Sequence, residues 1–429
     1  MTDWRSLLIT TTNKQGQIAI RPLLANVITV LRHHPAWEGV LVYNDFTQQI
    51  HKRKQPPCAD YIVPPSPTDE WTDGDILRLV DWLSREESLH VTPEVAHGAA
   101  VTVAKVHSYH PVRSYLASLK WDGCKRLPTW LSDYLGAAPN PYATMVGIKW
   151  MISAVARVIQ PGCKADHMIV LEGSQGLGKS TALRILGGDW YTDELADMGS
   201  KDSALQLRGA WIIELSELDA VNRSDTSRVK AFVSRTTDRF REPYGKLVAA
   251  YPRQCVFAGS SNHDQYLRDE TGNRRFWPVA CDAIHIASLK RFRDQLWAEA
   301  VHRYKSGEAW WPESAESVIA REEQESRYQH DEWEVSISRY LSNKEDVSVG
   351  EILANLFMID KSQWTKRDQN RVASCLAALS WQRHQTRVNG KREWRYFPNV
   401  TIQRPVTIQK ANGDTNGDSK NDNDFTLFN

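Results

Sequence analysis

The segment Gly173-Ser-Gln-Gly-Leu-Gly-Lys-Ser180 has the residue types and spacing of a phosphate-binding loop, GxxxxGK[ST]. An apolar run, His167–Leu171, precedes it and a helical pattern, Lys179–Leu186, follows it. The glycines let backbone N–H groups approach phosphates, Lys179 can reach the β and γ oxygens, and the Ser180 hydroxyl can hold Mg²⁺. We therefore predict a nucleoside triphosphate site formed by Gly173, Ser174, Gln175, Gly176, Leu177, Gly178, Lys179, Ser180 and Thr181.

Such a site needs an acid at the end of a neighbouring strand to complete the metal site and orient water. The run Ala210–Leu215 predicts that strand, and it supplies Glu214, with Glu217 three residues on. One glutamate would join Ser180 at the Mg²⁺ and the other would polarise the attacking water. The pattern does not decide which glutamate does which, and a solvated acidic pair at a strand exit is the alternative.

A third predicted strand, Gln254–Ala258, leads to Asn262, whose amide could sense the γ-phosphate. An asparagine selected for turn formation fits that position equally well. Arg274 and Arg275 follow, and an arginine that reaches into a neighbouring subunit's site would stabilise transition-state charge. An exposed arginine pair at a sheet edge is the simpler reading of Arg-Arg by itself.

Short β-like runs alternate with helical patterns between His167 and Trp277, which indicates an α/β domain with a largely parallel sheet. Helices are also expected from Thr72, over Pro141–Ile159 with a stop at Pro161-Gly162, and over the acidic Glu313–Glu334. Near the C-terminus the order helix, helix, basic hairpin, with its turn at Asn389-Gly390, is that of a winged helix. The predicted divisions are an N-terminal accessory region (1–65), a helical collar or linker domain (66–160), the P-loop ATPase domain (161–310), an acidic helix with a winged-helix-like domain (311–404) and a disordered tail (405–429).

The ordered motifs resemble the virulence-associated E family of phage and mobile-element proteins. The matching stretches are His110-Pro-Val112 with Trp121-Asp-Gly123, the P-loop, Glu214–Glu217, Arg241–Gly245 and Gly272–Pro278. That family is similar to superfamily 3 replicative helicases, which are ring-forming AAA+ ATPases. The resemblance implies an AAA+ core with an α-rich N-terminal region, and it implies ATP and Mg²⁺ as cofactors.

The resemblance also implies a role for each matched residue. Lys179 and Ser180 would be Walker A, Glu214 the Walker B acid, Asn262 the sensor, and Arg274 or Arg275 the finger that acts on a neighbour in a hexamer or similar ring. The basic hairpin that superfamily 3 proteins place in the central channel corresponds to Arg239–Lys246. Many superfamily members have adjacent acids at Walker B, whereas Glu214 and Glu217 are three residues apart.

Charge is unevenly distributed, although the whole chain has a formal net charge of only +1. Residues 223–275 carry eleven Lys/Arg and six Asp/Glu, and residues 382–397 carry five basic residues and one acid. Basic residues interleaved with Phe240 and Tyr244 suit a strand-tracking contact, with the rings available for base stacking. A mixed, solvated face is the alternative for the first region, and a protein contact is the alternative for the second. The predicted DNA contacts are Arg239, Arg241, Tyr244 and Lys246 in the first region, and Arg387, Lys391 and Arg392 in the second.

The six cysteines form no CxxC pair, which is typical of thiols in a reducing cytosol. The uncharged apolar runs are too short for a membrane span and the N-terminus lacks a signal-peptide core, so we expect a cytoplasmic protein without a membrane contact. The last residues, Asp424–Asn429, resemble a sliding-clamp-binding peptide, although a fraying tail with incidental aromatics is the favoured reading.

These observations predict an ATP-driven DNA helicase or translocase that acts on single-stranded and forked DNA during replication of a phage or mobile element. Residues 1–110 lack the acidic pairs of a priming site, so a primase would be a separate partner. The alternative is an AAA+ nucleotide switch, such as a loader or a defence NTPase, without unwinding activity. A small-molecule kinase is disfavoured, because the basic hairpin and the candidate finger would have no role in it.

Overall fold

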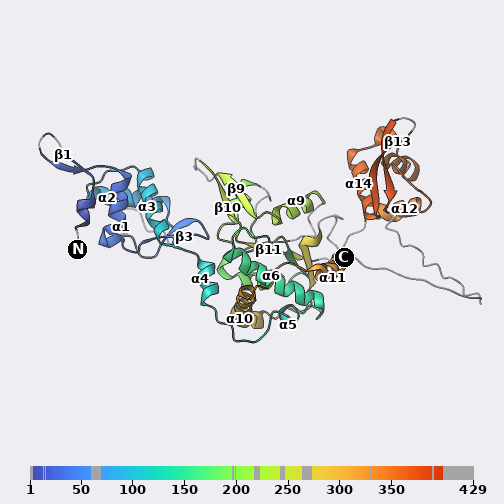
Figure 1. Ribbon diagram of the computed structural model, residues 1–429, viewed down its shortest axis with the longest axis horizontal. Helices are drawn as coiled ribbons and strands as arrows, with labels where there is room; N and C mark the ends of the chain where they lie inside the picture. The colour runs from blue at the N-terminus through green and yellow to red at the C-terminus, as the bar shows by residue number, and fades with distance from the viewer. Residues whose placement is uncertain are drawn as a thin grey trace, which may run out of the picture. The chain divides into compact units, whose positions relative to one another are not determined.

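The chain divides into two compact units, residues 1–330 and residues 331–429, and each has its own hydrophobic core. The computed structural model, drawn in Figure 1, describes residues 3–12, 14, 16–58, 69–195, 198, 200–216, 223–241, 247–262, 273–327, 331–388 and 391–399.

A five-stranded parallel sheet forms the centre of the first unit, in the order β12-β6-β11-β8-β7. Its strands are β6 (Met168–Glu172), β7 (Tyr191–Thr192), β8 (Ile212–Leu215), β11 (Val256–Ser261) and β12 (Phe276–Ala280). The three central strands, β6, β11 and β8, are wholly buried, because a parallel sheet connected by helices is covered on both faces. The mixed α/β class with a parallel sheet, predicted from the sequence, is confirmed.

The two faces of the sheet pack into two separate cores, and alternate residues of one strand enter each of them. In β6, Ile169 and Leu171 join the core formed with α6 (Pro141–Ile159), α7 (Lys179–Gly187) and α10 (Ile286–Lys305), whereas Met168 and Val170 join the opposite core. That second core includes residues of α9 (Arg223–Val233). The period of two residues is the expected geometry of a strand with both faces buried.

Helix α6 lies inside the larger core, as the apolar pattern of residues 141–159 predicts. Among the described residues it is the one helix long and apolar enough to cross a membrane, but 83% of its most apolar window is buried inside the unit. The indole N–H of Trp150 donates to the Phe257 carbonyl at 3.0 Å, and that of Trp211 donates to the Ala154 carbonyl at 2.9 Å. These bonds tie α6 to the central sheet and satisfy two buried donors.

The N-terminal part of this unit mixes strands and helices around a core of its own. It contains β1 (Thr10–Thr12), β2 (Ile18–Ile20), α1 (Leu24–His33), β3 (Leu41–Asn44), β4 (Gln49–Lys52), α2 (Asp73–Glu86), α3 (Pro93–Val106) and β5 (Ser108–Tyr109), with short 3₁₀ helices η1 (Trp4–Leu7) and η2 (Pro35–Trp37). The expected division at residue 65 does not separate two cores, because Leu31 and Trp37 pack in the same cluster as Leu79 and Ala100. A three-stranded sheet, β4-β3-β5, also makes this region less helical than expected.

The remaining elements of the first unit connect these parts. They are α4 (Pro111–Ser118), α5 (Trp130–Leu135), η3 (Gly188–Trp190), α8 (Lys201–Gln206), β9 (Thr237–Arg241), β10 (Val248–Pro252), η5 (Asn273–Arg275) and α11 (Ser314–Ser326). Strands β9 and β10 pair antiparallel as a separate ribbon. The acidic segment 313–334, expected as one helix, is two helices: α11 packs on β12 and α6 in the first unit, and α12 begins the second unit.

The second unit is a small helical core with a hairpin. Its elements are α12 (Glu332–Leu341), α13 (Val349–Glu351), η6 (Ile352–Leu356), η7 (Lys361–Gln363), α14 (Lys366–Ala378), β13 (Trp381–Val388) and β14 (Lys391–Pro398). Val347, in the segment between α12 and α13, forms an isolated antiparallel β-bridge with Tyr396 of β14, on the outer side of the hairpin. The predicted order of helix, helix and basic hairpin is present.

Candidate nucleotide site and nucleic-acid surfaces

The phosphate-binding loop connects β6 to α7 at the carboxyl end of the central sheet. At Gly173 the backbone φ is +149°, and a Cβ there would lie 2.8 Å from the Cys281 carbonyl oxygen. Gly178 has φ of +99° and is the N-cap of α7, where no side chain satisfies the first amides. Because the first turn of a helix has unpaired N–H groups, this end of α7 offers donors to an anion. Ser174, Gln175 and Gly176 are exposed, so the loop is open to a ligand.

Lys179 is 6% exposed, and its ammonium lies over the loop. Its Nζ donates to the carbonyl oxygens of Gly173 at 2.7 Å and Ser174 at 2.9 Å, and to Oδ1 of Asn262 at 3.1 Å. Asn262 comes from the end of β11, the strand beside β6. The structure therefore brings together the candidate Walker A lysine and the candidate sensor amide, which are more than eighty residues apart in the sequence.

Glu214 is 1% exposed at the end of β8 and accepts three hydroxyl hydrogen bonds. Ser180 and Ser260 donate to its Oε1, each at 2.7 Å, and Tyr191 of β7 donates to its Oε2. Burial and the bond to Glu214 raise the pKa of the Tyr191 hydroxyl, so it stays protonated and donates. Tyr191 and Ser260 were missed in the sequence: Ser260 lies in a polar run at a strand end that signals a site, but nothing local marks Tyr191.

The oxygens of Ser180 and Glu214 fit Mg²⁺, which prefers hard oxygen ligands and keeps several waters and phosphate oxygens in its shell. Among the described residues, no group of three or more His, Cys, Asp or Glu side chains is positioned to hold a metal ion. The protein would supply two ligands, and the nucleotide phosphates and water the rest. Glu217, the second candidate acid, lies outside the described residues.

A buried ion pair lies directly beside the loop and was not predicted. Glu172, the last residue of β6, is 3% exposed, and Arg327 after α11 donates to both of its carboxylate oxygens at 3.2–3.3 Å. Arg327 also contacts Glu323 of α11. The pair fixes the end of α11 to the strand that carries the nucleotide loop.

Arg274 and Arg275 lie at the other end of the sheet, in η5 before β12. Strand β12 runs parallel to β6, with Phe276 opposite Met168 and Ala280 opposite Glu172, so the arginines are separated from the loop by the length of a strand. Five residues at ~3.3 Å each place them roughly 16 Å from the loop. The Arg275 Nε donates to Ser234 Oγ at 2.5 Å, whereas Arg274 is exposed.

His167 also lies at this end of the sheet and stacks on Trp277, with ring centroids 4.3 Å apart. Burial lowers its pKa to about 4; Asp166 opposes the shift, and the charges of Arg274, Lys164 and Arg275 add to it. The imidazole is therefore neutral near pH 7.

Residues 116–329, which include the nucleotide loop, Glu214, Asn262 and both arginines, match the family described as the virulence-associated protein E-like domain. The chain contains a virulence-associated protein E-like domain. The family resemblance seen in the sequence is thereby confirmed for this part of the chain. No curated protein matches the chain.

Two similar solved structures both show the apo C-terminal region, residues 305–718, of NrS-1. The first has 13% sequence identity and a TM-score of 0.45, and the match covers 88% of this chain and 98% of that one. The second, an A-form structure, has 12% identity and a TM-score of 0.42, with 88% and 99% covered. At this level the likeness says nothing about what this chain binds or does.

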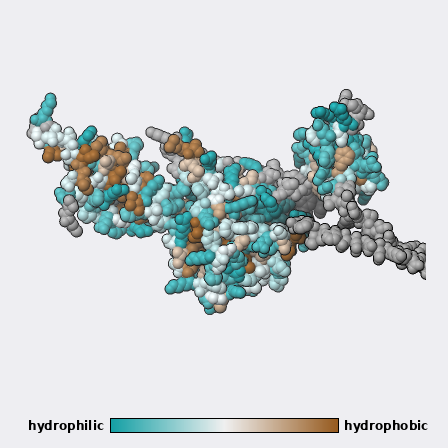
Figure 2. Space-filling model, viewed as in Figure 1, coloured by the Kyte–Doolittle hydropathy of each residue, from teal (hydrophilic) through white to brown (hydrophobic). Residues whose placement is uncertain are grey.

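Within the virulence-associated protein E-like domain, the predicted DNA hairpin is the β9–β10 ribbon. Arg239 and Arg241 are exposed on β9, whereas Tyr244 and Lys246 lie outside the described residues. Phe240 was expected to be available for base stacking, but it is only 8% exposed. Its ring stacks on Tyr251 of β10, with ring centroids 4.5 Å apart, and lies beneath the Arg208 guanidinium. Leu247 and Val248 are 83% and 68% exposed, and Figure 2 shows hydrophobic surface on this ribbon.

The other predicted DNA contacts belong to the C-terminal unit, outside the matched domain. Arg387 of β13 and Arg392 of β14 are exposed and directly opposite each other in the hairpin register. Lys391 pairs in register with Val388, but its side chain is outside the described part. Arg395, also counted in the basic hairpin, binds Asp346 at 2.5 Å and Glu351 at 2.9 Å, so its charge is neutralised within the unit.

Proposed function

We propose that the chain is an ATP-dependent DNA helicase or translocase that acts in replication of a phage or mobile element. The observation that carries this proposal is the convergence of Lys179, Ser180, Glu214 and Asn262 at the carboxyl ends of three neighbouring parallel strands. One strand, β11, separates the P-loop strand from the Walker B strand, in keeping with the AAA+ core that the family resemblance implies.

The proposed chemistry assigns a task to each of these groups. The uncapped first turn of α7 and the ammonium of Lys179 bind the phosphates of ATP and offset their charge. Mg²⁺, when bound, neutralises charge that develops between the β and γ phosphates. Ser180 and Glu214 hold it, Tyr191 and Ser260 orient the Glu214 carboxylate, and Asn262 positions the attacking water. Glu217 remains a second candidate base.

The position of the arginines supports a ring in which each nucleotide site is shared between two subunits. Arg274 is too far from the loop of its own chain to contact the γ-phosphate, but it is exposed and can reach a nucleotide in a neighbouring subunit. Arg275 is held by Ser234, which makes Arg274 the better candidate for the trans-acting finger. The proposed assembly is a hexamer or similar ring in which hydrolysis moves the β9–β10 ribbon along one DNA strand.

The proposal extends to the C-terminal unit, the protein partners and the cellular location. The C-terminal unit would be winged-helix-like and grip duplex DNA through Arg387, Lys391 and Arg392, and a separate primase would supply primers. The residues proposed for sliding-clamp contact, 424–429, lie outside the described residues. The proposed location is the cytoplasm.

DNA-stimulated ATP hydrolysis and displacement of a strand from a forked duplex test the proposal. We expect wild-type protein to do both, Lys179→Ala to do neither, and Lys164→Ala, whose side chain is 73% exposed, to match wild type. Hydrolysis without displacement would favour the nucleotide-switch alternative. No hydrolysis in wild type would contradict the proposed site.

The ribbon has its own test. The double variant Arg239→Ala/Arg241→Ala should keep basal hydrolysis and lose displacement, because it removes charges that contact the strand. Arg321→Ala, an exposed arginine on α11, serves as the matched control. Full displacement by the double variant, or by Lys246→Ala, would exclude the ribbon as the moving part.

A further inference from the structure

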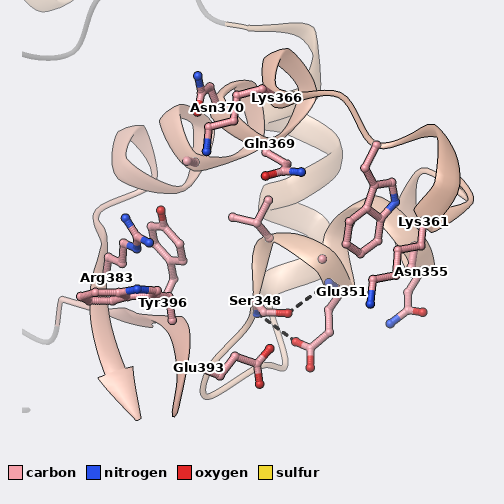
Figure 3. A pocket seen from close by; sticks show the side chains of 16 residues that line it. Ser348, Glu351, Asn355, Lys361, Lys366, Gln369, Asn370, Arg383, Glu393 and Tyr396 are labelled. Atoms are coloured by element: carbon pink, nitrogen blue, oxygen red, sulfur yellow. Dashed lines mark hydrogen bonds between the residues drawn. The ribbon is translucent and has the colours of Figure 1, made fainter. Parts of the chain in front are cut away.

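A groove of about 580 Å³ lies in the C-terminal unit between one face of α14 and the β13–β14 hairpin. The α14 residues that line it, Lys366, Gln369, Asn370 and Ala373, have the spacing of a single helix face. In Figure 3 the Gln369 side chain points from the helix towards the groove, and Arg383 lies on the hairpin side. The volume is in the range of small-ligand sites, ~300–1,000 Å³.

An exposed aromatic side chain stands on the hairpin side of this groove. Trp394 is 48% exposed, although an indole gains free energy from burial. The guanidinium of Arg383 lies 4.2 Å from its ring centroid, so a cation and an aromatic ring are presented together. Such a pair is suited to stacking with a flat, electron-rich group such as a nucleobase.

A second tryptophan lines the groove and is held in a fixed orientation. The Trp364 indole donates to the Ile359 carbonyl oxygen at 3.0 Å. A Cβ at Gly350 would lie 2.8 Å from the Trp364 ring, so glycine is the residue that permits this close packing. The groove thus has aromatic side chains from two different segments of the unit.

The charges of the groove favour an anion. Its lining has three cations and two carboxylates. Glu351 binds Arg395 at 2.9 Å and accepts from the Ser348 amide at 2.9 Å, and Glu393 lies 3.7 Å from the same guanidinium, so both carboxylates are drawn towards Arg395. By contrast, Lys361 and Lys366 are exposed and make no ion pair with another described residue. These lysines and Arg383 leave a positive lining.

The same hairpin carries Arg387 and Arg392 opposite each other. Like charges at directly opposed positions destabilise a β-ladder. A polyanion that passes over both would remove that cost, which argues for a ligand with several phosphates rather than one isolated anion.

We propose that this groove binds unpaired nucleotides of single-stranded DNA. A base stacks with Trp394, and Lys361 and Lys366 hold the flanking phosphates. The volume suits about one or two nucleotides, whereas a duplex keeps its base faces stacked inside and offers none to Trp394. The inference rests on the proposed function in taking DNA as the substrate, and it adds a second single-strand site outside the ATPase domain.

Equilibrium binding of the full chain to three fluorescein-labelled DNA probes, measured without ATP, tests whether the groove binds single-stranded DNA. The probes are oligo(dT), an abasic oligomer of equal length and charge, and a blunt duplex. We expect Trp394→Ala to weaken oligo(dT) binding about tenfold, the lower part of the range for one stacked base. Binding of the abasic oligomer should be unchanged, Trp394→Phe should restore most of the affinity, and Trp311→Ala, at a 51% exposed tryptophan of the first unit, should match wild type.

The lysines should behave differently. Lys361→Ala/Lys366→Ala should weaken oligo(dT) and abasic binding equally and reduce the salt-dependence slope by about 1.4, since each lost single-strand phosphate contact contributes ~0.7. Lys344→Ala, at an exposed lysine of the same unit away from the groove, should leave the slope unchanged.

Cross-linking to an oligonucleotide that carries 5-iododeoxyuridine locates the contact directly. Peptides that contain Trp394 or Trp364 should be labelled. Labels confined to the β9–β10 ribbon, or a loss of oligo(dT) binding in Trp394→Ala that is equalled by the loss of abasic or duplex binding, would overturn the proposal. Equal competition by an acidic peptide would overturn it too.

The groove and the proposed function fail separately. If oligo(dT) binds in the groove but the wild-type chain neither hydrolyses ATP nor displaces a strand, the groove stands and the proposed function falls. If the chain unwinds a fork, Trp394→Ala binds oligo(dT) as wild type does and neither groove tryptophan is labelled, the groove alone falls.

Discussion

The two ends of the central sheet are built differently, although the same strands connect them. At the carboxyl end, the buried Lys179 and Glu214 are hydrogen-bonded to side chains from neighbouring strands and the loop, Lys179 to Asn262 and Glu214 to Ser180 and Ser260. At the amino end, Arg274 is exposed beside a neutral His167, and only Arg275 is held by a neighbour. The first end is organised before any ligand arrives. The second presents the charge of Arg274 to the surface, in keeping with the proposed action on a neighbouring subunit.

The largest expected effect is at the carboxyl end. Lys179→Ala should lose ATP binding and slow hydrolysis by at least about 10³-fold, because the substituted site lacks the cation that faces the phosphates. Binding of a fluorescent ATP analogue and phosphate release measure the two losses. Hydrolysis within tenfold of wild type would show that this end is not the nucleotide site, and the comparison between the ends would collapse.

The amino end gives the next largest effect. Arg274→Ala should keep ATP binding but reduce kcat about 10³-fold, as expected for loss of a trans-acting finger. Arg275→Ala should instead cost about 1 kcal/mol of stability, through the lost bond to Ser234.

Mixing two inactive variants tests whether Arg274 acts between subunits. A mixture of Arg274→Ala and Lys179→Ala should recover part of the activity, because each Lys179→Ala subunit supplies an intact arginine to its neighbour. Activity in a strictly monomeric protein, or no recovery in the mixture, would remove the functional contrast between the two ends.

Glu214→Gln separates metal binding from nucleotide binding at the carboxyl end. The amide keeps the shape but lacks the charge that holds Mg²⁺, so hydrolysis should fall about 10²-fold and need more Mg²⁺, with ATP binding retained. Glu194→Gln, an exposed acid after β7, is the control. An unchanged Mg²⁺ dependence in Glu214→Gln would assign the metal to another acid, with Glu217 the first to test.

The smallest effect concerns pH and the amino end. His167 has a folded pKa of about 4 against 6.5 in the unfolded chain, so unfolding takes up a proton as the pH falls below about 6.5. Stability should therefore fall by about 2 kcal/mol between pH 7 and pH 5, with further loss as the pH approaches 4. His167→Phe, which keeps an aromatic face on Trp277, should remove that part of the pH dependence in thermal unfolding. Identical pH profiles for the variant and wild type would show that the imidazole is not held neutral.

Local sequence patterns predict the parts of the fold whose causes are local. The glycine spacing and the flanking apolar run predict β6, the loop and α7 within a residue or two, and the bounds of α6 follow from Pro141 and Pro161-Gly162. The capping residue Thr72 likewise begins α2 at Asp73. Each of these is decided by the backbone preferences of a few adjacent residues.

Contacts between distant segments explain the rest. Tyr191 reaches Glu214 only because β7 pairs with β8, and nothing in its own neighbourhood indicates a site. Phe240 is buried because it lies against Tyr251 across the ribbon and under Arg208 from a separate segment. Similarly, the sequence does not distinguish Arg274 from Arg275, whereas in the fold Ser234 binds Arg275. The spacing of residues along the chain does not predict these contacts between distant segments.

The contact at Gly173 has a mechanical consequence. Strand β12 begins two residues after Arg274. Cys281 follows its last residue, and a Cβ on Gly173 would lie only 2.8 Å from the Cys281 carbonyl oxygen. A hydrogen-bonded strand of five residues resists compression, so it is a short, stiff connection between the exposed Arg274 and the first glycine of the loop. A displacement of Arg274 along the strand would therefore be transmitted to the loop at Gly173.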